Sequence, residues 1–196
     1  MTVGDGRSSS GGATISEDPV DLPLGRLERW MRDHVDGFRG PVIAERFEGG
    51  QSNPTYKLVA GTGTYVLRRK PFGHLLPSAH AVDREYRVMR ALTDTAVPVP
   101  RMYALCEDDA VIGSAFFVME FLDGRVFWDQ RLPGLDPTDR RAMFASMNAV
   151  IAALHSVDHI AVGLDGFGRP GNYMARQIGR WSKQYQASET EPQPVP

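Results

Sequence analysis

Residues 49–70 read GGQSNPTYKLVAGTGTYVLRRK, a glycine-rich turn followed by two strand-like segments. The segments at 55–60 and 64–70 are rich in β-branched and aromatic residues, and a short Gly-Thr-Gly link joins them. This pattern predicts a β-hairpin. The turn at 49–54 offers backbone N–H groups that suit phosphate oxygens, and the Ser52 hydroxyl could add a donor. A plain turn explains the same residues, so on this segment alone both interpretations stay open.

The second strand of this hairpin alternates apolar and charged side chains. Because neighbouring residues of a strand point to opposite faces, Val66, Arg68 and Lys70 share one face. A cation beside an apolar residue suits a nucleotide, with the base against Val66 and the phosphates at Arg68. An edge strand with solvated charges would show the same pattern, and this alternative stays open.

A helix predicted at 79–93 places a carboxylate among apolar side chains. Its apolar face is formed by Val82, Tyr86, Met89 and Leu92. At about 100° per residue, Glu85 lies inside this apolar stripe. A carboxylate buried there needs a cation or several hydrogen-bond donors. We therefore predict an ion pair between Glu85 and Arg68; the alternative is that Glu85 lies at the edge of the stripe and reaches water.

Residues 116–124 read FFVMEFLDG and end where the pattern of the chain changes. A strand that joins two lobes can offer its backbone N–H and C=O groups to a nucleotide base. Glu120 and Leu122 are the candidates for this role. Taken alone, the segment is also explained as a core strand.

The chain divides into four segments by composition and periodicity. These are a disordered Gly/Ser-rich tail at 1–20, a lobe at 21–122, a linker at 123–135 and a helical block at 136–196. The lobe contains an amphipathic helix after residue 24, then the order β, β, β, α, β, β. The helical block begins with Asp136 as a candidate N-cap and Pro137 in the first turn. It stops in a proline-rich tail, which predicts an apolar face left uncovered.

Composition excludes several classes of protein. The 196 residues carry 22 basic and 24 acidic side chains, so the basic surplus of a nucleic-acid or anionic-membrane binder is missing. The single cysteine, Cys106, excludes an intrachain disulfide and fits a reducing cytoplasm. No apolar run is long enough for a membrane span or a signal peptide core. The sequence also lacks the HExxH, GxSxG and CxxC motifs.

The order of these features resembles the aminoglycoside phosphotransferase family. The matching strings are GGQSNPTYKL, TYVLRRKP, VDREYRVMRAL, VPVPRMYALCED, FFVMEFLDG, LHSVD and GFGRPGNYMARQIGRWSKQY. The last string is most similar to the branch whose kinase-like domain is also fused to acyl-CoA dehydrogenases in animals. The resemblance covers about residues 40–190. It implies an α+β, protein-kinase-like fold, in which a small antiparallel-sheet lobe with one helix precedes an incomplete helical lobe.

The resemblance implies transfer of phosphate from ATP or GTP to a small-molecule hydroxyl group. By position, Ser52 matches a loop residue that touches the phosphates, Arg68 the strand cation, and Glu85 its ion-pair partner. The family cation is usually lysine, and Arg68 differs from it in geometry, so Lys70 stays an alternative. The nucleotide-binding residues implied together are Gly50, Ser52, Asn53, Val66, Arg68, Lys70, Glu85, Met119, Glu120 and Leu122.

The catalytic motif of the family is missing from the sequence. The family uses a HxDxxxxN segment and a later aspartate to position the acceptor hydroxyl and to hold Mg²⁺. None of the five histidines begins this motif. We therefore expect the catalytic residues and the Mg²⁺ ligands to lie beyond Pro196, and this chain alone to be inactive. The expected partner is the rest of the helical lobe, in the same or another chain; the alternative is a non-catalytic module that binds nucleotide or a partner.

Overall fold

A computed structural model describes residues 10–11, 14–16, 20–48, 53–72, 80–127, 129–168 and 171–188. Its strands are β1 (Ser10–Gly11), β2 (Val42–Arg46), β3 (Thr55–Ala60), β4 (Gly63–Arg69), β5 (Met102–Cys106), β6 (Phe116–Glu120) and β7 (Val126–Phe127). Its helices are α1 (Leu24–His34), α2 (Val82–Leu92), α3 (Asp109–Ile112), α4 (Pro137–His155) and α5 (Tyr173–Ser188). The chain forms two compact units, Met1–Val157 and Asp158–Pro196.

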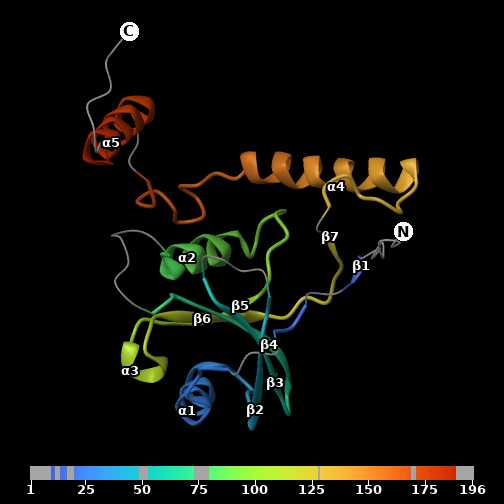
Figure 1. The fold of residues 1–196 in the computed structure, drawn as a ribbon, viewed down its shortest axis with the longest axis vertical. Coiled ribbons are helices and arrows are strands. Elements are labelled where there is room, and N and C mark those ends of the chain that lie inside the picture. Colours follow the sequence, from blue (N-terminus) through green and yellow to red (C-terminus); the bar gives the residue numbers. More distant parts are fainter. Residues whose placement is uncertain are drawn as a thin grey trace, which may run out of the picture. The chain divides into compact units, whose positions relative to one another are not determined.

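An antiparallel five-stranded sheet with the order β2-β3-β4-β6-β5 is the centre of the first unit (Figure 1). The predicted hairpin is confirmed as β3 and β4, with Lys57 opposite Val66 and Thr55 opposite Arg68. This register places all four of these side chains on the same face of the sheet. The α+β, protein-kinase-like fold class is thereby confirmed for this sheet-containing lobe.

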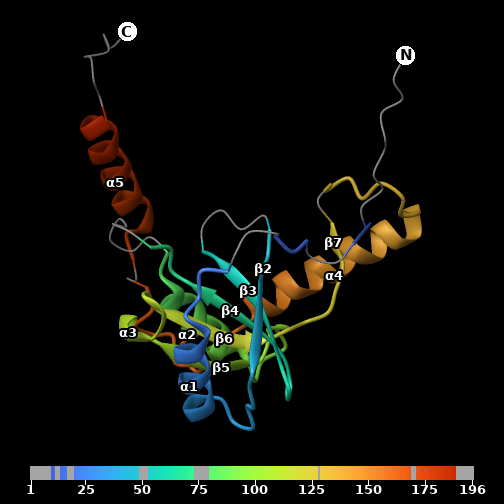
Figure 2. The same ribbon diagram turned by 60° about the horizontal axis from the view of Figure 1, so that its bottom comes forward.

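Helices α1 and α2 cover opposite faces of the sheet (Figures 1 and 2). The α1 face holds the larger core cluster, in which Leu27 and Met31 pack with sheet residues such as Tyr56, Leu58 and Leu67. The smaller cluster under α2 contains Val82, Met102, Ala115 and Phe117.

A buried arginine joins the sheet to the segment before α1. Arg69 is only 3% exposed, and its Nη2 donates to Asp21 Oδ2 at 2.8 Å. The Tyr56 hydroxyl donates to Asp21 Oδ1 at 2.8 Å and accepts from Arg69 Nε at 3.3 Å. Burial raises the pKa of Asp21, but the Tyr56 hydrogen bond and the Arg69 charge outweigh it and hold this pKa below its usual value. Arg69 and Tyr56 are thus satisfied inside an otherwise apolar core by each other and by the half-exposed Asp21.

The first residues of the chain differ from the expected disordered tail of residues 1–20 where they are described. Ser10–Gly11 pairs with Val126–Phe127, and Ile15 bridges to Phe47 beside β2. These contacts are made by backbone groups, which can extend a free strand edge whatever the side chains are. Composition therefore could not predict them. The short helix α3 is a single turn between β5 and β6, and Asp108 caps it by accepting from the Ala110 N–H at 2.9 Å.

Helix α4 begins as predicted. Asp136 Oδ1 accepts from the N–H groups of Thr138 and Asp139 at 2.7 and 2.9 Å, and Pro137 occupies the first turn. Its large apolar side chains remain exposed in the described structure: Phe144, Met147, Ile151 and Leu154. In the second unit, α5 exposes Tyr173, Met174, Ile178, Trp181 and Tyr185. Among the described residues, no helix is both long and apolar enough to cross a membrane.

Candidate nucleotide-binding site

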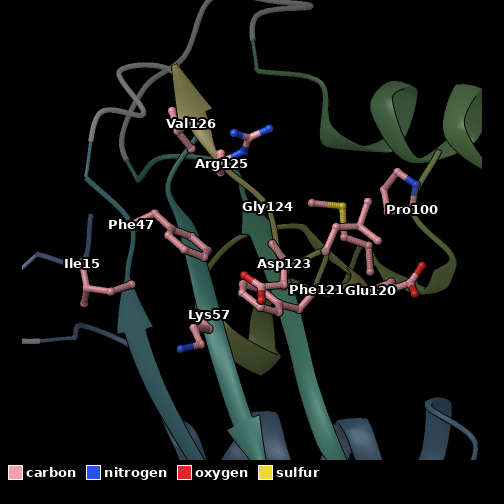
Figure 3. A pocket seen from close by; sticks show the side chains of 13 residues that line it. Ile15, Phe47, Lys57, Pro100, Glu120, Phe121, Asp123, Gly124, Arg125 and Val126 are labelled. Atoms are coloured by element: carbon pink, nitrogen blue, oxygen red, sulfur yellow. The ribbon is translucent and has the colours of Figure 1, made fainter. Parts of the chain in front are cut away.

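A cavity of about 490 Å³ opens on the face of the sheet that also carries α2 (Figure 3). Its lining residues are Ile15, Phe47, Lys57, Val66, Pro100, Met119, Glu120, Phe121, Leu122, Asp123, Gly124, Arg125 and Val126. Most of the lining between the strands is apolar, while Lys57, Asp123 and Arg125 bring charges to it. A mostly apolar cleft with a few polar groups is the usual form of a small-molecule site.

The floor of the cavity comes from three neighbouring strands. Val66 of β4 lies between Lys57 of β3 and Met119 of β6, its direct partners in the sheet. Val66 is almost fully buried, so it presents a fixed apolar surface to the cavity. The ammonium of Lys57 lies 5.5 Å from the centre of the Phe121 ring and 3.4 Å from the Glu45 carboxylate. Val66 and Met119, two of the residues that the resemblance implied for nucleotide binding, therefore lie side by side in this floor.

The segment after β6 forms one wall of the cavity. The backbone of Leu122 makes no hydrogen bond within the described part of the chain, and its side chain is exposed. Glu120 is turned toward Arg101: its N–H donates to the Arg101 carbonyl at 2.8 Å, and its carboxylate accepts from the Arg101 N–H at 3.0 Å. The Glu120 carboxylate is therefore hydrogen-bonded to the loop that contains Arg101. The N–H and C=O groups of Leu122 have no partner within the described part of the chain.

The predicted ion pair between Arg68 and Glu85 is confirmed. Arg68 Nε donates to Glu85 Oε2 at 2.6 Å, and Arg68 Nη1 donates to the Thr55 hydroxyl at 3.0 Å. About a third of each charged side chain is exposed, 29% for Arg68 and 35% for Glu85. Arg68 lies two residues along β4 from Val66 on the same face, about 7 Å from the cavity floor. Its Nη2 has no hydrogen-bond partner among the described residues.

Lys70 lies apart from this pair. Its Nζ is 4.0 Å from Asp83, and its side chain borders a second cavity of about 320 Å³ that Phe72 and Ser114 also line. Glu85 therefore pairs with Arg68 and not with Lys70. This difference follows from α2, whose turn from Asp83 to Glu85 brings the two carboxylates to different positions along β4.

The glycine-rich turn is described only at its ends. Gly50 and Ser52 lie outside the described residues, so their predicted phosphate contacts stay predictions. Asn53 is described and is 2% exposed. Its Nδ2 donates to Glu85 Oε1 at 2.7 Å, and its Oδ1 lies 3.0 Å from His80 Nδ1. Asn53 thus contacts the Arg68–Glu85 pair from the side of the turn.

Sequence reasoning missed several cavity residues. Lys57 could have been found, because the hairpin link fixes its register opposite Val66. Phe47 and Phe121 gave no separate signal in an apolar context, and Ile15 lies in a segment expected to be disordered. The described residues hold no group of three or more His, Cys, Asp or Glu side chains that could bind a metal ion.

The sequence matches the phosphotransferase enzyme family (APH) over residues 43–195. The chain belongs to this family. A crystal structure named as that of an aminoglycoside phosphotransferase from Ralstonia eutropha has the same fold, with a TM-score of 0.74 and 57% sequence identity. That match covers 87% of this chain and 49% of the other protein.

Curated relatives confirm the predicted branch of the family. Acyl-CoA dehydrogenase family member 10 of Mus musculus is 45% identical over 175 residues, which cover 89% of this chain and 16% of that protein. Acyl-CoA dehydrogenase family member 11 of Homo sapiens is 42% identical over 166 residues, which cover 83% of this chain and 21% of that protein. This phosphotransferase-family chain thus spans about a fifth of the length of these relatives.

Proposed function

We propose that this chain is the nucleotide-binding N-terminal part of a phosphotransferase that transfers phosphate from ATP or GTP to a small-molecule hydroxyl group. The observation that carries the proposal is the cavity over Val66 and Met119, with the Arg68–Glu85 pair on the same face of the sheet. This arrangement combines an apolar cavity that can hold a base with a cation, Arg68, that can bind the phosphates. Membership of the phosphotransferase family supports this use of the site.

The base is proposed to lie against Val66 and Met119. A flat purine ring gains most of its binding free energy from apolar contact, and these side chains provide it on one side. The Leu122 N–H and the Glu120 carbonyl are proposed to hold the polar edge of the base. The Leu122 backbone supports this assignment, because it has no partner within the described chain.

The phosphates are proposed to lie toward Arg68. A guanidinium held by a carboxylate at one edge can donate from its other edge to phosphate oxygens. Arg68 has this form, with Nε bonded to Glu85. Gly50, Ser52 and Asn53 are proposed to bring the glycine-rich turn to the phosphates. Lys70 is the weaker candidate, because its ammonium lies beside Asp83.

Chemistry requires groups that this sequence does not contain. Transfer breaks the bond from the γ-phosphorus to its bridging oxygen and forms a bond to the acceptor oxygen, whose proton must pass to a base. The family resemblance assigns that base and the Mg²⁺ ligands to the HxDxxxxN segment, which the sequence lacks. We therefore expect nucleotide binding without turnover by this chain alone. Among the residues that the structure describes, no cluster of His, Cys, Asp or Glu side chains could hold Mg²⁺.

The expected partner is the rest of a helical lobe, in the same or another chain. Two observations support it: α4 and α5 each expose a set of large apolar side chains, and the Ralstonia eutropha protein is about twice as long as the matched part. Exposed apolar faces of this kind mark surfaces that another element covers. We expect a cytoplasmic setting, because the single cysteine, Cys106, allows no disulfide within this sequence.

Calorimetric titration of the chain with ATP, GTP and adenosine tests this proposal. A Val66→Phe variant fills the floor of the cavity. Its matched control is Val59→Phe, because Val59 of β3 lies on the same face of the sheet as Val66 but does not line the cavity. We expect V66F to weaken all three ligands by about tenfold or more and V59F to leave them unchanged. Equal affinities in the wild type and V66F would overturn the assignment of the cavity.

A further inference from the structure

Four polar side chains form one continuous hydrogen-bonded chain beside the candidate phosphate position. His80 Nδ1 lies 3.0 Å from Asn53 Oδ1, Asn53 Nδ2 donates to Glu85 Oε1 at 2.7 Å, and Arg68 Nε donates to Glu85 Oε2 at 2.6 Å. These residues come from the loop before α2, the turn before β3, α2 itself and β4. The chain of bonds thus ties together separate segments around one cation.

The chemistry of the groups fixes the direction of every bond. An ionised carboxylate only accepts, so the Asn53 amide nitrogen must face Glu85. Asn53 Oδ1 therefore faces His80 and needs a donor. His80 must then carry a proton on Nδ1, whether the imidazole is neutral or charged.

Asn53 is hydrogen-bonded to both of the side chains that bind Arg68, Glu85 and Thr55. Its side chain binds Glu85, the acceptor of Arg68 Nε, and its backbone carbonyl accepts from the Thr55 hydroxyl at 3.1 Å. Thr55 is in turn the acceptor of Arg68 Nη1. With the Thr55 proton given to Asn53, the lone pairs of the hydroxyl are left for Arg68. Asn53 thus contacts both groups that hold the guanidinium, Glu85 through its side-chain amide and Thr55 through its backbone carbonyl.

The backbone of His80 is the third observation. His80 has a φ of 58°, in the left-handed region, which is unfavourable for a residue with a Cβ atom. Its carbonyl accepts from the Val82 N–H at 2.9 Å, where α2 starts. Histidine is among the residues that tolerate this conformation better than most. This backbone conformation places the imidazole of His80 within hydrogen-bond distance of Asn53 Oδ1.

We infer that Asn53 and His80 are positioning residues, which hold Arg68 with its Nη2 edge turned to the phosphates of the bound nucleotide. They act through Glu85 and Thr55 and need not touch the nucleotide themselves. The inference rests on the proposed function for the role of Arg68, but the positioning can be measured without any nucleotide.

The test measures hydrogen exchange of the Arg68 Nε–H by NMR in the free chain. Asn53→Ala removes the amide, and His80→Gly removes the imidazole while suiting the left-handed backbone, so that the second variant is expected to fold. Loss of a hydrogen bond in the network should raise the exchange rate by about tenfold in N53A and less in H80G. The matched controls, N148A on α4 and H34A on α1, should leave the rate unchanged.

The second readout is the affinity for ATP compared with that for adenosine. Mispositioning of Arg68 should weaken ATP about tenfold and leave adenosine unchanged, because only ATP carries phosphates. Unchanged exchange in both variants would overturn the inference, as would equal losses for ATP and adenosine. If the wild-type chain binds neither ligand, the proposed function fails, and the exchange rates still decide whether Asn53 and His80 position Arg68.

Discussion

Arg68 and Arg69 are neighbours in β4, but they face opposite sides of the sheet and have different surroundings. Arg69 is 3% exposed, bonds Asp21, Tyr56 and the Lys70 carbonyl, and lies 3.8 Å from the centre of the Phe72 ring. About a third of the Arg68 side chain is exposed to solvent, and its Nη2 has no hydrogen-bond partner among the described residues. A cation whose three nitrogens are each hydrogen-bonded within the fold stabilises that fold, whereas a cation with an unused nitrogen can bind a ligand.

The same contrast holds for the two faces of the sheet. The α1 face is closed by a large apolar cluster, and its buried polar groups satisfy one another. The α2 face has a small cluster beneath the helix and a cavity of about 490 Å³ beside it. One face therefore supplies most of the stability of this lobe, and the other is available for function.

The largest effect on stability is expected from Arg69→Met. This change removes the Arg69 donors to Asp21 Oδ2 and to the buried Tyr56 hydroxyl, although Tyr56 still donates to Asp21 Oδ1. The free energy of unfolding should therefore fall by about 3 kcal/mol. The matched change Arg68→Met should cost less than about 1 kcal/mol, since that pair is partly hydrated. Urea unfolding of both variants measures the difference. A larger loss in R68M than in R69M would break the comparison between the two arginines.

Gly113→Ala should disturb the Arg69 side indirectly. Gly113 has a φ of 88°, and a Cβ there would lie 2.8 Å from the Phe72 ring, which stacks on Arg69. The strained backbone and the displaced ring should together cost about 2 kcal/mol. Thermal unfolding measures this, with Gly166→Ala as control, because nothing lies near that position. Equal stability of G113A and the wild type would show that the Phe72 contact contributes little.

Asp21→Asn should make the stability of the α1 face less dependent on pH. The pKa of Asp21 is held below its usual value of 3.8, so its stabilisation is complete above that pH and is lost as the pH falls through the lower folded-state pKa. The variant should be less stable by about 1 kcal/mol near neutral pH, a value reduced because half of the side chain is hydrated. The gap between the two proteins should close in acid. Unfolding curves from pH 7 to pH 2 measure it, and a constant gap would contradict the ion pair.

The smallest expected effect is the coupling between Arg68 and Glu85. Single and double alanine variants in a double-mutant cycle should give a coupling of about 1 kcal/mol, because the pair is partly exposed. The corresponding cycle for Arg69 and Asp21 should give a larger value. If the stability changes of R68A and E85A are simply additive, the contact does not contribute in solution.

Glu85 shows what the sequence could predict. Its place in the apolar stripe of a helix required a partner, and β4 offered Arg68 on the correct face. The alternation of β4 also separated Arg68 from Arg69, but it could not reveal that Arg69 is the buried one. That depends on Asp21, which lies 48 residues earlier in the chain and contacts Arg69 only in the folded structure.

Other parts of the site depend on backbone geometry that composition does not encode. The left-handed conformation of His80 and the backbone pairing of Ile15 with Phe47 are examples. The family resemblance implied a nucleotide-binding role for Asn53, and its contacts with Glu85 and His80 became visible only in the folded chain. Family resemblance implied which residues form the proposed site, and side-chain geometry shows which of these residues contact one another.

The most direct test of the central claim is an NMR titration of the chain with ATP. We predict that chemical shifts change at Val66, Met119 and Leu122 around the cavity and at the Arg68 Nε–H. Leu27 and Met31 on the α1 face should remain unchanged. Shift changes confined to the α1 face, or none at the cavity when ATP is saturating, would contradict the claim that the two faces of this sheet divide stability and nucleotide binding between them.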